Sequence, residues 1–106
     1  MYLDLTQFFY DVNHGVLTEE PLSVKKRMGN FKMTIGKRIK NIEIKTGENL
    51  LFSKGKGIHA KTYLDMRLIG YLCMYIKNIE VESKLLFDEE IMNKYIIVEE
   101  KVVTKI

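Results

Sequence analysis

Four apolar side chains near the start of the chain recur with the spacing of one helix face. They stand at i, i+3, i+4 and i+7: Leu5, Phe8, Phe9 and Val12. We therefore predict a helix over residues 4–12 that ends in the turn-forming stretch 13–15. A strand is the alternative, because Phe, Tyr and Val also suit extended backbone.

Residues 18–28 place acidic and basic positions in the order that a helix favours. Thr18 can cap the amino end, two acids follow in the first turn, and basic residues fill the last turn. Pro21 fits only in that first turn, and Gly29-Asn30 is a suitable stop. We predict a second helix here.

Residues 34–46 are compatible with a helix or a strand. Ile42 and Ile44 alternate as in a strand, whereas Ile35, Ile39 and Ile42 share one face of a helix. The helix separates charge from apolar surface better, so we favour it, with Thr34 as cap and Gly47 as stop. The face opposite the isoleucines would carry Lys37, Arg38, Asn41 and Lys45.

Two short apolar runs, 49–52 and 58–64, flank the turn sequence SKGKG. They predict a β-hairpin whose turn glycines adopt positive φ. Asp65 can then cap a helix over 66–77 that is apolar on most sides, which is typical of a buried helix at the centre of a core. Residues 88–95 predict a short capped helix, and 96–106 predict one or two terminal strands.

These elements predict one α+β domain over residues 1–106. We expect a helix-turn-helix-like pair and a β-hairpin wing, both packed on the buried central helix. The pair consists of the helices over 18–28 and 34–46. A basic second helix followed by a lysine-bearing wing is an arrangement that many proteins use to contact DNA.

Charge is distributed unevenly along the 106 residues. Residues 24–61 contain eleven basic and two acidic residues, whereas the segments before and after them are net acidic. Such a basic central segment is typical of a surface that binds phosphates. The alternative is a solvated lysine surface without a partner.

Residues that could support catalysis or bind a metal are sparse. His14 and His59 are far apart and belong to no ligand cluster, and Cys73 falls on the apolar face of the buried helix, so we expect a core thiol. Asp88-Glu89-Glu90 fits a helix start better than a metal site. We therefore expect no enzyme, no metal site and no cofactor.

We also expect an intracellular protein, in the cytoplasm or in the nucleus of the cell. A lone cysteine suits a reducing compartment. The chain shows no secretory signal at its start and no run of about 18 apolar residues, the length that a membrane span needs.

Two blocks of the sequence resemble the KilA-N domain, a DNA-binding module of phages and large DNA viruses. The stretch TYLDMRLIGYLCMYI carries a Thr62-Tyr63 pair, a Leu68-Ile69 pair and Tyr75-Ile76 where that family has an aromatic-Ile pair. Upstream, GKRIKNIEIKTGENLL (36–51) is similar to the family's Gly-Lys-Arg-aromatic-x-Asn-Trp segment. The resemblance is clearest over 22–81.

The chain departs from the family pattern at several positions. Asp65-Met66 replaces the family's His-Pro, Ile42 replaces one Trp, and Tyr75 replaces another. The resemblance implies a divergent DNA-binding protein of viral or phage origin that acts in transcription or replication. Viral members of that family often carry a second, zinc-binding domain. We do not expect one here, because the chain has one Cys and two His.

The expected partner is double-stranded DNA, and the expected contacts lie in the basic central segment. They comprise Lys25, Lys26, Arg27, Lys37, Arg38, Lys40, Asn41, Lys45, Lys54, Lys56 and Lys61. Arg38 and Asn41 can each read a base edge with two hydrogen bonds.

A second hypothesis is an accessory protein that binds and inhibits a host protein after losing DNA binding. It requires an exposed apolar patch, for which the FFY stretch at 8–10 and the terminal strand are the candidates. The terminal stretch 96–106 could also pair across a two-fold axis into a homodimer.

Overall fold

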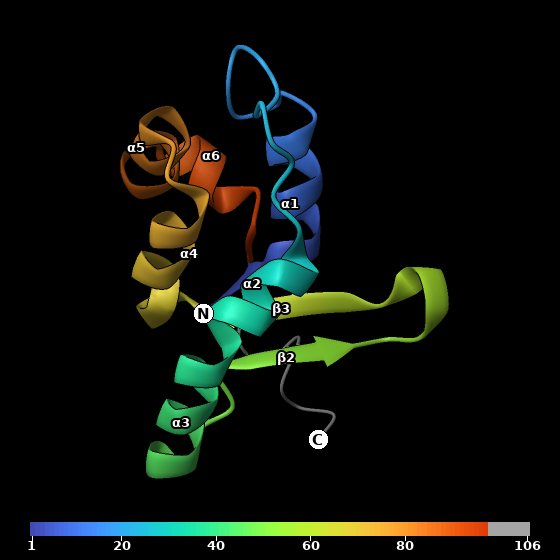
Figure 1. The fold of residues 1–106 in the computed structure, drawn as a ribbon, viewed down its shortest axis with the longest axis vertical. Helices are drawn as coiled ribbons and strands as arrows, with labels where there is room; N and C mark the ends of the chain where they lie inside the picture. The colour runs from blue at the N-terminus through green and yellow to red at the C-terminus, as the bar shows by residue number, and fades with distance from the viewer. Residues whose placement is uncertain (98–106) are drawn as a thin grey trace.

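The computed structural model describes residues 1–97, which form an α+β domain (Figure 1). The described elements are β1 (Tyr2–Asp4), α1 (Leu5–Asn13), α2 (Met28–Thr34), α3 (Gly36–Thr46), β2 (Leu51–Lys54), the 3₁₀ turn η1 (Gly57–His59), β3 (Lys61–Asp65), the 3₁₀ turn η2 (Met66–Leu68), α4 (Ile69–Ile76), α5 (Ile79–Phe87), α6 (Glu89–Asn93) and β4 (Ile96–Ile97). The predicted fold class is confirmed. Among residues 1–97, no helix has the length and apolar character needed to cross a bilayer.

The strands form one antiparallel sheet in the order β2-β3-β1-β4. β2 and β3 form the predicted hairpin, which projects sideways from the body (Figure 1). The predicted bounds are shifted: Ser53 and Lys54 belong to β2 and not to the turn, and Ile58 and His59 lie in η1 and not in the second strand. Its register pairs Leu51 with Leu64 and Lys54 with Lys61. Gly55 and Gly57 have φ values of +91° and +59°, as the hairpin prediction required.

The core is an aromatic and aliphatic cluster between the sheet and the helices. The four side chains predicted to share a face of α1 are all buried, which confirms the helix over 4–12. Phe9 packs against Phe31 of α2 and Tyr75 of α4, with ring centroids 5.9 and 6.1 Å away. This cluster fixes α2, and therefore the start of α3, to the body.

The buried helix predicted over 66–77 is also present. It begins with η2, where the Asp65 side chain accepts a hydrogen bond from the Arg67 amide, and it continues as α4. Cys73 lies in the core as predicted, and burial raises the pKa of its thiol. The helix ends at Lys77, whose φ is +52°.

The helix predicted over 18–28 is wrong, because residues 16–27 are irregular. The Thr18 hydroxyl donates to the nearby Glu20 carbonyl oxygen, a local bond that competes with a helix. Asn13 of α1, more distant in the chain, binds both the amide and the carbonyl of Lys26 at 2.9 and 2.8 Å. Helix α2 begins only at Met28.

The predicted helix stop at Gly29-Asn30 is also wrong, because both residues lie inside α2. The helix pair is α2 and α3, joined through Ile35 alone. Thr34 does not cap α3, because its hydroxyl donates to the Asn30 carbonyl oxygen at 2.8 Å. The predicted helix over 34–46 is otherwise confirmed, and Gly47 ends it with a φ of +71°.

Besides α2, two further elements were not anticipated from the sequence. β1 has three residues and occupies the middle of the sheet, and α5 follows directly after α4. Asn78 caps α5 by accepting a hydrogen bond from the Val81 amide at 3.0 Å. The short helix near 88–95 is confirmed as α6, with Asp88 as its cap. Of the terminal strands predicted over 96–106, Ile96–Ile97 form β4, and 98–106 lie outside the described residues.

The prediction of an exposed apolar patch at residues 8–10 is wrong. Phe8 and Phe9 are both core residues, and only Tyr10 of the three is exposed. Tyr10 instead stacks on His14, with ring centroids 4.0 Å apart. The apolar patch proposed for binding a host protein is therefore absent from this stretch.

Candidate nucleic-acid interface

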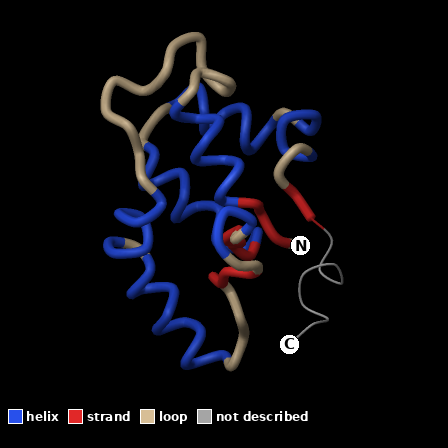
Figure 2. The backbone as a smooth tube through the Cα atoms, turned by 90° about the vertical axis from the view of Figure 1, so that its right-hand side faces the viewer, coloured by secondary structure: helices blue, strands red, loops and turns tan. Residues whose placement is uncertain are grey.

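Helix α3 presents a basic face at one end of the molecule. Ile39 is fully buried, and Ile35 and Ile42 pack against the core, so the opposite side of the helix faces solvent. Figure 2 shows α3 extending away from the other helices. We call the exposed side chains Lys37, Arg38, Lys40, Asn41 and Lys45 the basic face of α3. Ile44, which is 73% exposed, lies among them.

The cations of this face lack counter-ions within the described part of the chain. The ion pairs found among residues 1–97 involve other cations, namely Lys61, Arg67 and Lys84. No carboxylate of these residues lies within 4.0 Å of the charged groups of the basic face. Its positive charge is therefore available to an anionic partner.

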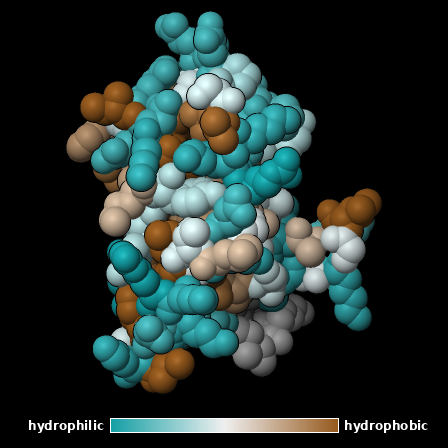
Figure 3. Space-filling view, in the orientation of Figure 1, coloured by the Kyte–Doolittle hydropathy of each residue, from teal (hydrophilic) through white to brown (hydrophobic). Residues whose placement is uncertain are grey.

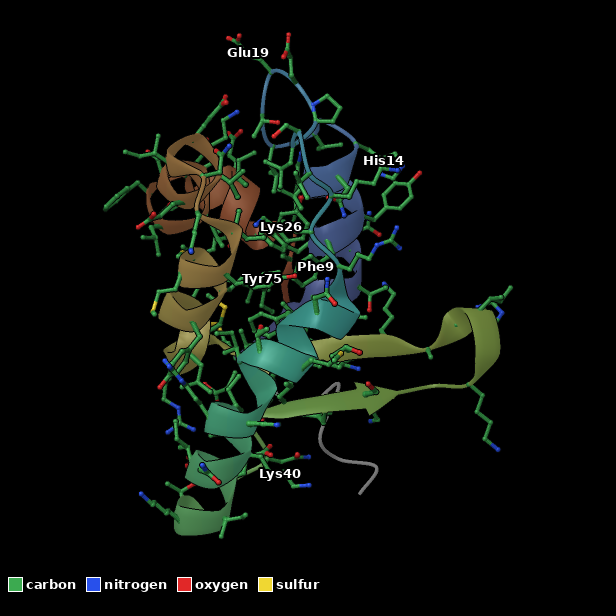
Figure 4. All side chains as sticks on the ribbon, in the orientation of Figure 1. Phe9, His14, Glu19, Lys26, Lys40 and Tyr75 are labelled. Atoms are coloured by element: carbon green, nitrogen blue, oxygen red, sulfur yellow. The ribbon has the colours of Figure 1, made fainter. Side chains whose placement is uncertain are left out.

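A groove of about 450 Å³ runs between α3 and strand β2. Lys32, Lys37 and Lys40 line it, and we call it the lysine groove. Figure 4 shows Lys40 on α3, below the hairpin. Ser53 and Thr62 line its other side, where their hydroxyl groups share a hydrogen bond of 2.8 Å. The Glu43 carboxylate also lines the groove. Three ammonium groups and two hydroxyls, against this one carboxylate, can bind phosphate oxygens.

Lys32 was not among the candidate residues chosen from the sequence. The expected end of a helix at residues 29–30 placed it in a turn. In the structure it lies in the last turn of α2 and lines the same groove as Lys37 and Lys40. Lys32 could have been found only by predicting that a helix begins at Met28. It would then lie one helical turn before α3, on the same side as the other lysines of the groove.

The hairpin lysines are arranged differently from the basic face. Lys54 and Lys61 are cross-strand partners, so they share the face of the hairpin opposite to the Ser53–Thr62 pair. Lys61 forms an ion pair of 2.9 Å with Asp4, and the hydrogen bond to this carboxylate and its charge raise the pKa of Lys61. Lys56 is exposed near the tip of the hairpin.

Lys25, Lys26 and Arg27 form a separate basic segment beside α4. The Lys26 ammonium lies 5.4 Å from the ring centroid of Tyr75, and the Tyr75 hydroxyl donates to the Arg27 carbonyl oxygen at 3.1 Å. These contacts hold against α4 the segment that precedes α2 in the chain. The Lys26 side chain is thus partly engaged by the protein itself, while Lys25 and Arg27 are exposed.

A larger hollow of about 590 Å³ lies at the other end of the molecule, between the irregular segment and the junction of α4 and α5. Glu19, Glu20 and Glu80 line it together with Lys26 and Lys77. This mixture of charges does not favour a polyanion. Within residues 1–97, no group of His, Cys, Asp or Glu side chains is arranged to hold a metal ion.

Comparisons of the chain with models of protein families, with curated proteins and with solved structures yield no match. The KilA-N resemblance therefore stays a prediction from the two sequence blocks. In the structure these blocks form α3 with the start of β2, and β3 with α4.

Proposed function

We propose that this protein binds double-stranded DNA through the basic face of α3 and the lysine groove. The observation that carries the proposal is the exposed set of cations on α3, which have no counter-ion among residues 1–97 and adjoin a groove lined by three lysines. The sequence resemblance to a DNA-binding family supports the same partner.

The dimensions of α3 suit a DNA groove. Its 11 residues span about 16 Å, and a helix of roughly 10–12 Å diameter fits the major groove, which is about 12 Å wide. The lysine groove flanks this helix on the hairpin side. A phosphate strand bordering the major groove would therefore lie along Lys32, Lys37 and Lys40, while the outer part of α3 meets the bases.

Arg38 and Asn41 are the side chains of this face that can distinguish bases. Arginine pairs with two acceptors of guanine, and asparagine pairs with a donor and an acceptor of adenine, each for about 1–3 kcal/mol of discrimination. Both residues are exposed on α3. Sequence preference is expected from these two residues, and affinity is expected mainly from lysines that displace counter-ions from phosphates.

Fluorescence anisotropy with a labelled generic duplex across a salt series tests the proposal. Log K should fall with log salt by roughly 0.9 for each phosphate neutralised, and the double variant Lys37→Ala/Arg38→Ala should bind at least tenfold more weakly, with a shallower slope. The matched control Lys84→Ala/Lys94→Ala removes the same charge from α5 and the end of α6, which Figure 1 shows far from α3. Equal losses in both variants, or a flat salt response, would refute specific use of α3.

A further inference from the structure

The tip of the β2–β3 hairpin displays an isoleucine to solvent. Ile58 lies in η1 and is 95% exposed. Figure 3 shows a hydrophobic side chain at the far end of the hairpin, separated from the rest of the apolar surface. Turn positions are usually polar or glycine, because an apolar side chain there gains no burial. The chain thus presents an apolar side chain where the fold does not need one.

The backbone at this tip is ordered by its own hydrogen bonds. The His59 amide donates to the Lys56 carbonyl oxygen and the Ala60 amide to the Gly57 carbonyl oxygen, both at 3.2 Å. A Cβ on Gly55 would come within 2.8 Å of the His59 carbonyl oxygen, so the chain closes tightly there. Ile58 is therefore held outward by a formed turn.

The surroundings of Ile58 are basic. Residues 49–64 contain Lys54, Lys56 and Lys61 and no acidic residue, although Lys61 is paired with Asp4 of β1. An occupant that accepts this apolar side chain should therefore carry negative charge close to an apolar interior. Duplex DNA meets both conditions, because its phosphates flank stacked bases.

The reach of the tip matches the depth of a DNA groove. The last cross-strand partners of the hairpin are Lys54 and Lys61, and residues 55–60 extend beyond them. Two residues separate Lys54 from the 3₁₀ turn that holds Ile58, and they cover at most about 7 Å. The minor groove is about 7.5 Å deep. With Lys54 at the level of the phosphates, Ile58 would arrive at the base edges.

We propose that Ile58 is a wedge that inserts between base pairs from the minor groove and bends the duplex bound by α3. This inference rests on the proposed DNA binding and adds deformation of the DNA to it. Insertion would partly unstack one base step, and burial of the Ile58 side chain would offset part of that cost. Flexible pyrimidine–purine steps such as TA should be bent most readily.

The test measures binding and bending on one sample. A duplex of about 20 base pairs with a central TA step carries a donor and an acceptor dye at its ends, so anisotropy reports binding and energy transfer reports bending. Wild-type protein should raise the transfer efficiency at saturation. Ile58→Ala should lose at least half of that rise, with the salt slope unchanged. The control Ile79→Ala, at an 85% exposed residue of α5, should bend the duplex like wild type.

The outcomes separate this inference from the proposed function. Saturable anisotropy without any rise in transfer efficiency, or an equal rise with Ile58→Ala, would overturn the wedge and leave DNA binding intact. Absence of duplex binding would refute the proposed function and the wedge with it. If Ile58→Ala instead abolished binding to phosphatidylserine-containing vesicles while duplex bending persisted, the tip would be a lipid contact and the wedge would be overturned. Because Ile58 is exposed, thermal unfolding of Ile58→Ala should match wild type.

Discussion

The Glu43 carboxylate holds the amide of Leu50 across the end of α3. Its Oε2 atom accepts hydrogen bonds from the Leu50 amide at 2.7 Å and from the Leu51 amide at 3.1 Å. Glu43 is also the acidic residue among the described residues that line the lysine groove. One side chain therefore ties α3 to β2 and reduces the positive charge of the candidate DNA site.

Substitutions at Glu43 should separate these two effects. Glu43→Gln keeps a carbonyl oxygen as acceptor and removes the charge, so DNA affinity should rise by up to about fivefold at low salt, because one charge beside a phosphate costs about 1 kcal/mol in water. Glu43→Ala should raise affinity similarly but lower the free energy of unfolding by about 1–3 kcal/mol, since the buried Leu50 amide loses its acceptor. Anisotropy and urea unfolding measure the two quantities. A decrease in DNA affinity with Glu43→Gln would show that the DNA does not bind at the lysine groove.

Removal of the Tyr95 hydroxyl should destabilise the fold in a pH-dependent way. Tyr95 is fully buried, and its hydroxyl donates to the Asp11 carboxylate at 2.6 Å. Tyr95→Phe should cost about 1.5–3 kcal/mol near pH 8, as expected for a hydrogen bond to a charged group.

The same contact determines the behaviour at high pH. Burial and the bond to Asp11 raise the pKa of Tyr95 above the value of about 10 expected in the unfolded chain. Above pH 10 the unfolded state therefore loses its proton before the folded state does, and stability falls. The difference between wild type and Tyr95→Phe should shrink from pH 8 to pH 11 in urea unfolding. A constant difference would contradict this linkage.

Two glycines of the hairpin turn should differ in their tolerance of alanine. Gly55→Ala adds a Cβ that meets the His59 carbonyl oxygen at 2.8 Å, in addition to the strain of a φ of +91°. Gly57→Ala meets no atom within 4 Å and carries only the cost of a positive φ, about 1–2 kcal/mol. Hydrogen exchange of the hairpin amides should therefore increase more for Gly55→Ala. Equal effects would mean that the turn rearranges readily.

Acid should weaken the junction of β3 and η2. Burial alone would raise the pKa of Asp65, but the hydrogen bonds and charge of Arg67 outweigh it and lower that pKa below its ordinary value. The stabilisation is present at neutral pH and is lost as the pH falls below about 4 through the lower pKa of the folded state.

Arg67→Gln tests this contribution. The variant should be less stable than wild type at pH 7, and the difference should narrow at pH 3, as measured by urea unfolding. Lys94→Gln is the control, because Lys94 is an exposed cation with no ion pair among residues 1–97. A difference that persisted unchanged at pH 3 would show that Arg67 stabilises the fold by packing alone.

The elements recovered from the sequence are those whose evidence is local. The spacing that ends in Val12 identified α1, the isoleucines around Ile39 identified α3, and the glycines at 55 and 57 identified the hairpin turn. A helix face or a turn involves residues close in the chain, so its pattern is visible in sequence. The helix predicted over 18–28 failed because the Thr18 hydroxyl bonds to nearby backbone, and because Asn13 of α1 binds the backbone of Lys26.

The sequence by itself determined the buried and exposed faces of α1 and α3 and the concentration of positive charge in the central third of the chain. Only the tertiary structure decided that β1 lies in the middle of the sheet, that Lys32 shares a groove with Lys40, and that Lys61 pairs with Asp4. The physical reason is distance along the chain: strand pairing, ion pairs and grooves join residues that no local period relates. Their partners are selected when the whole core packs.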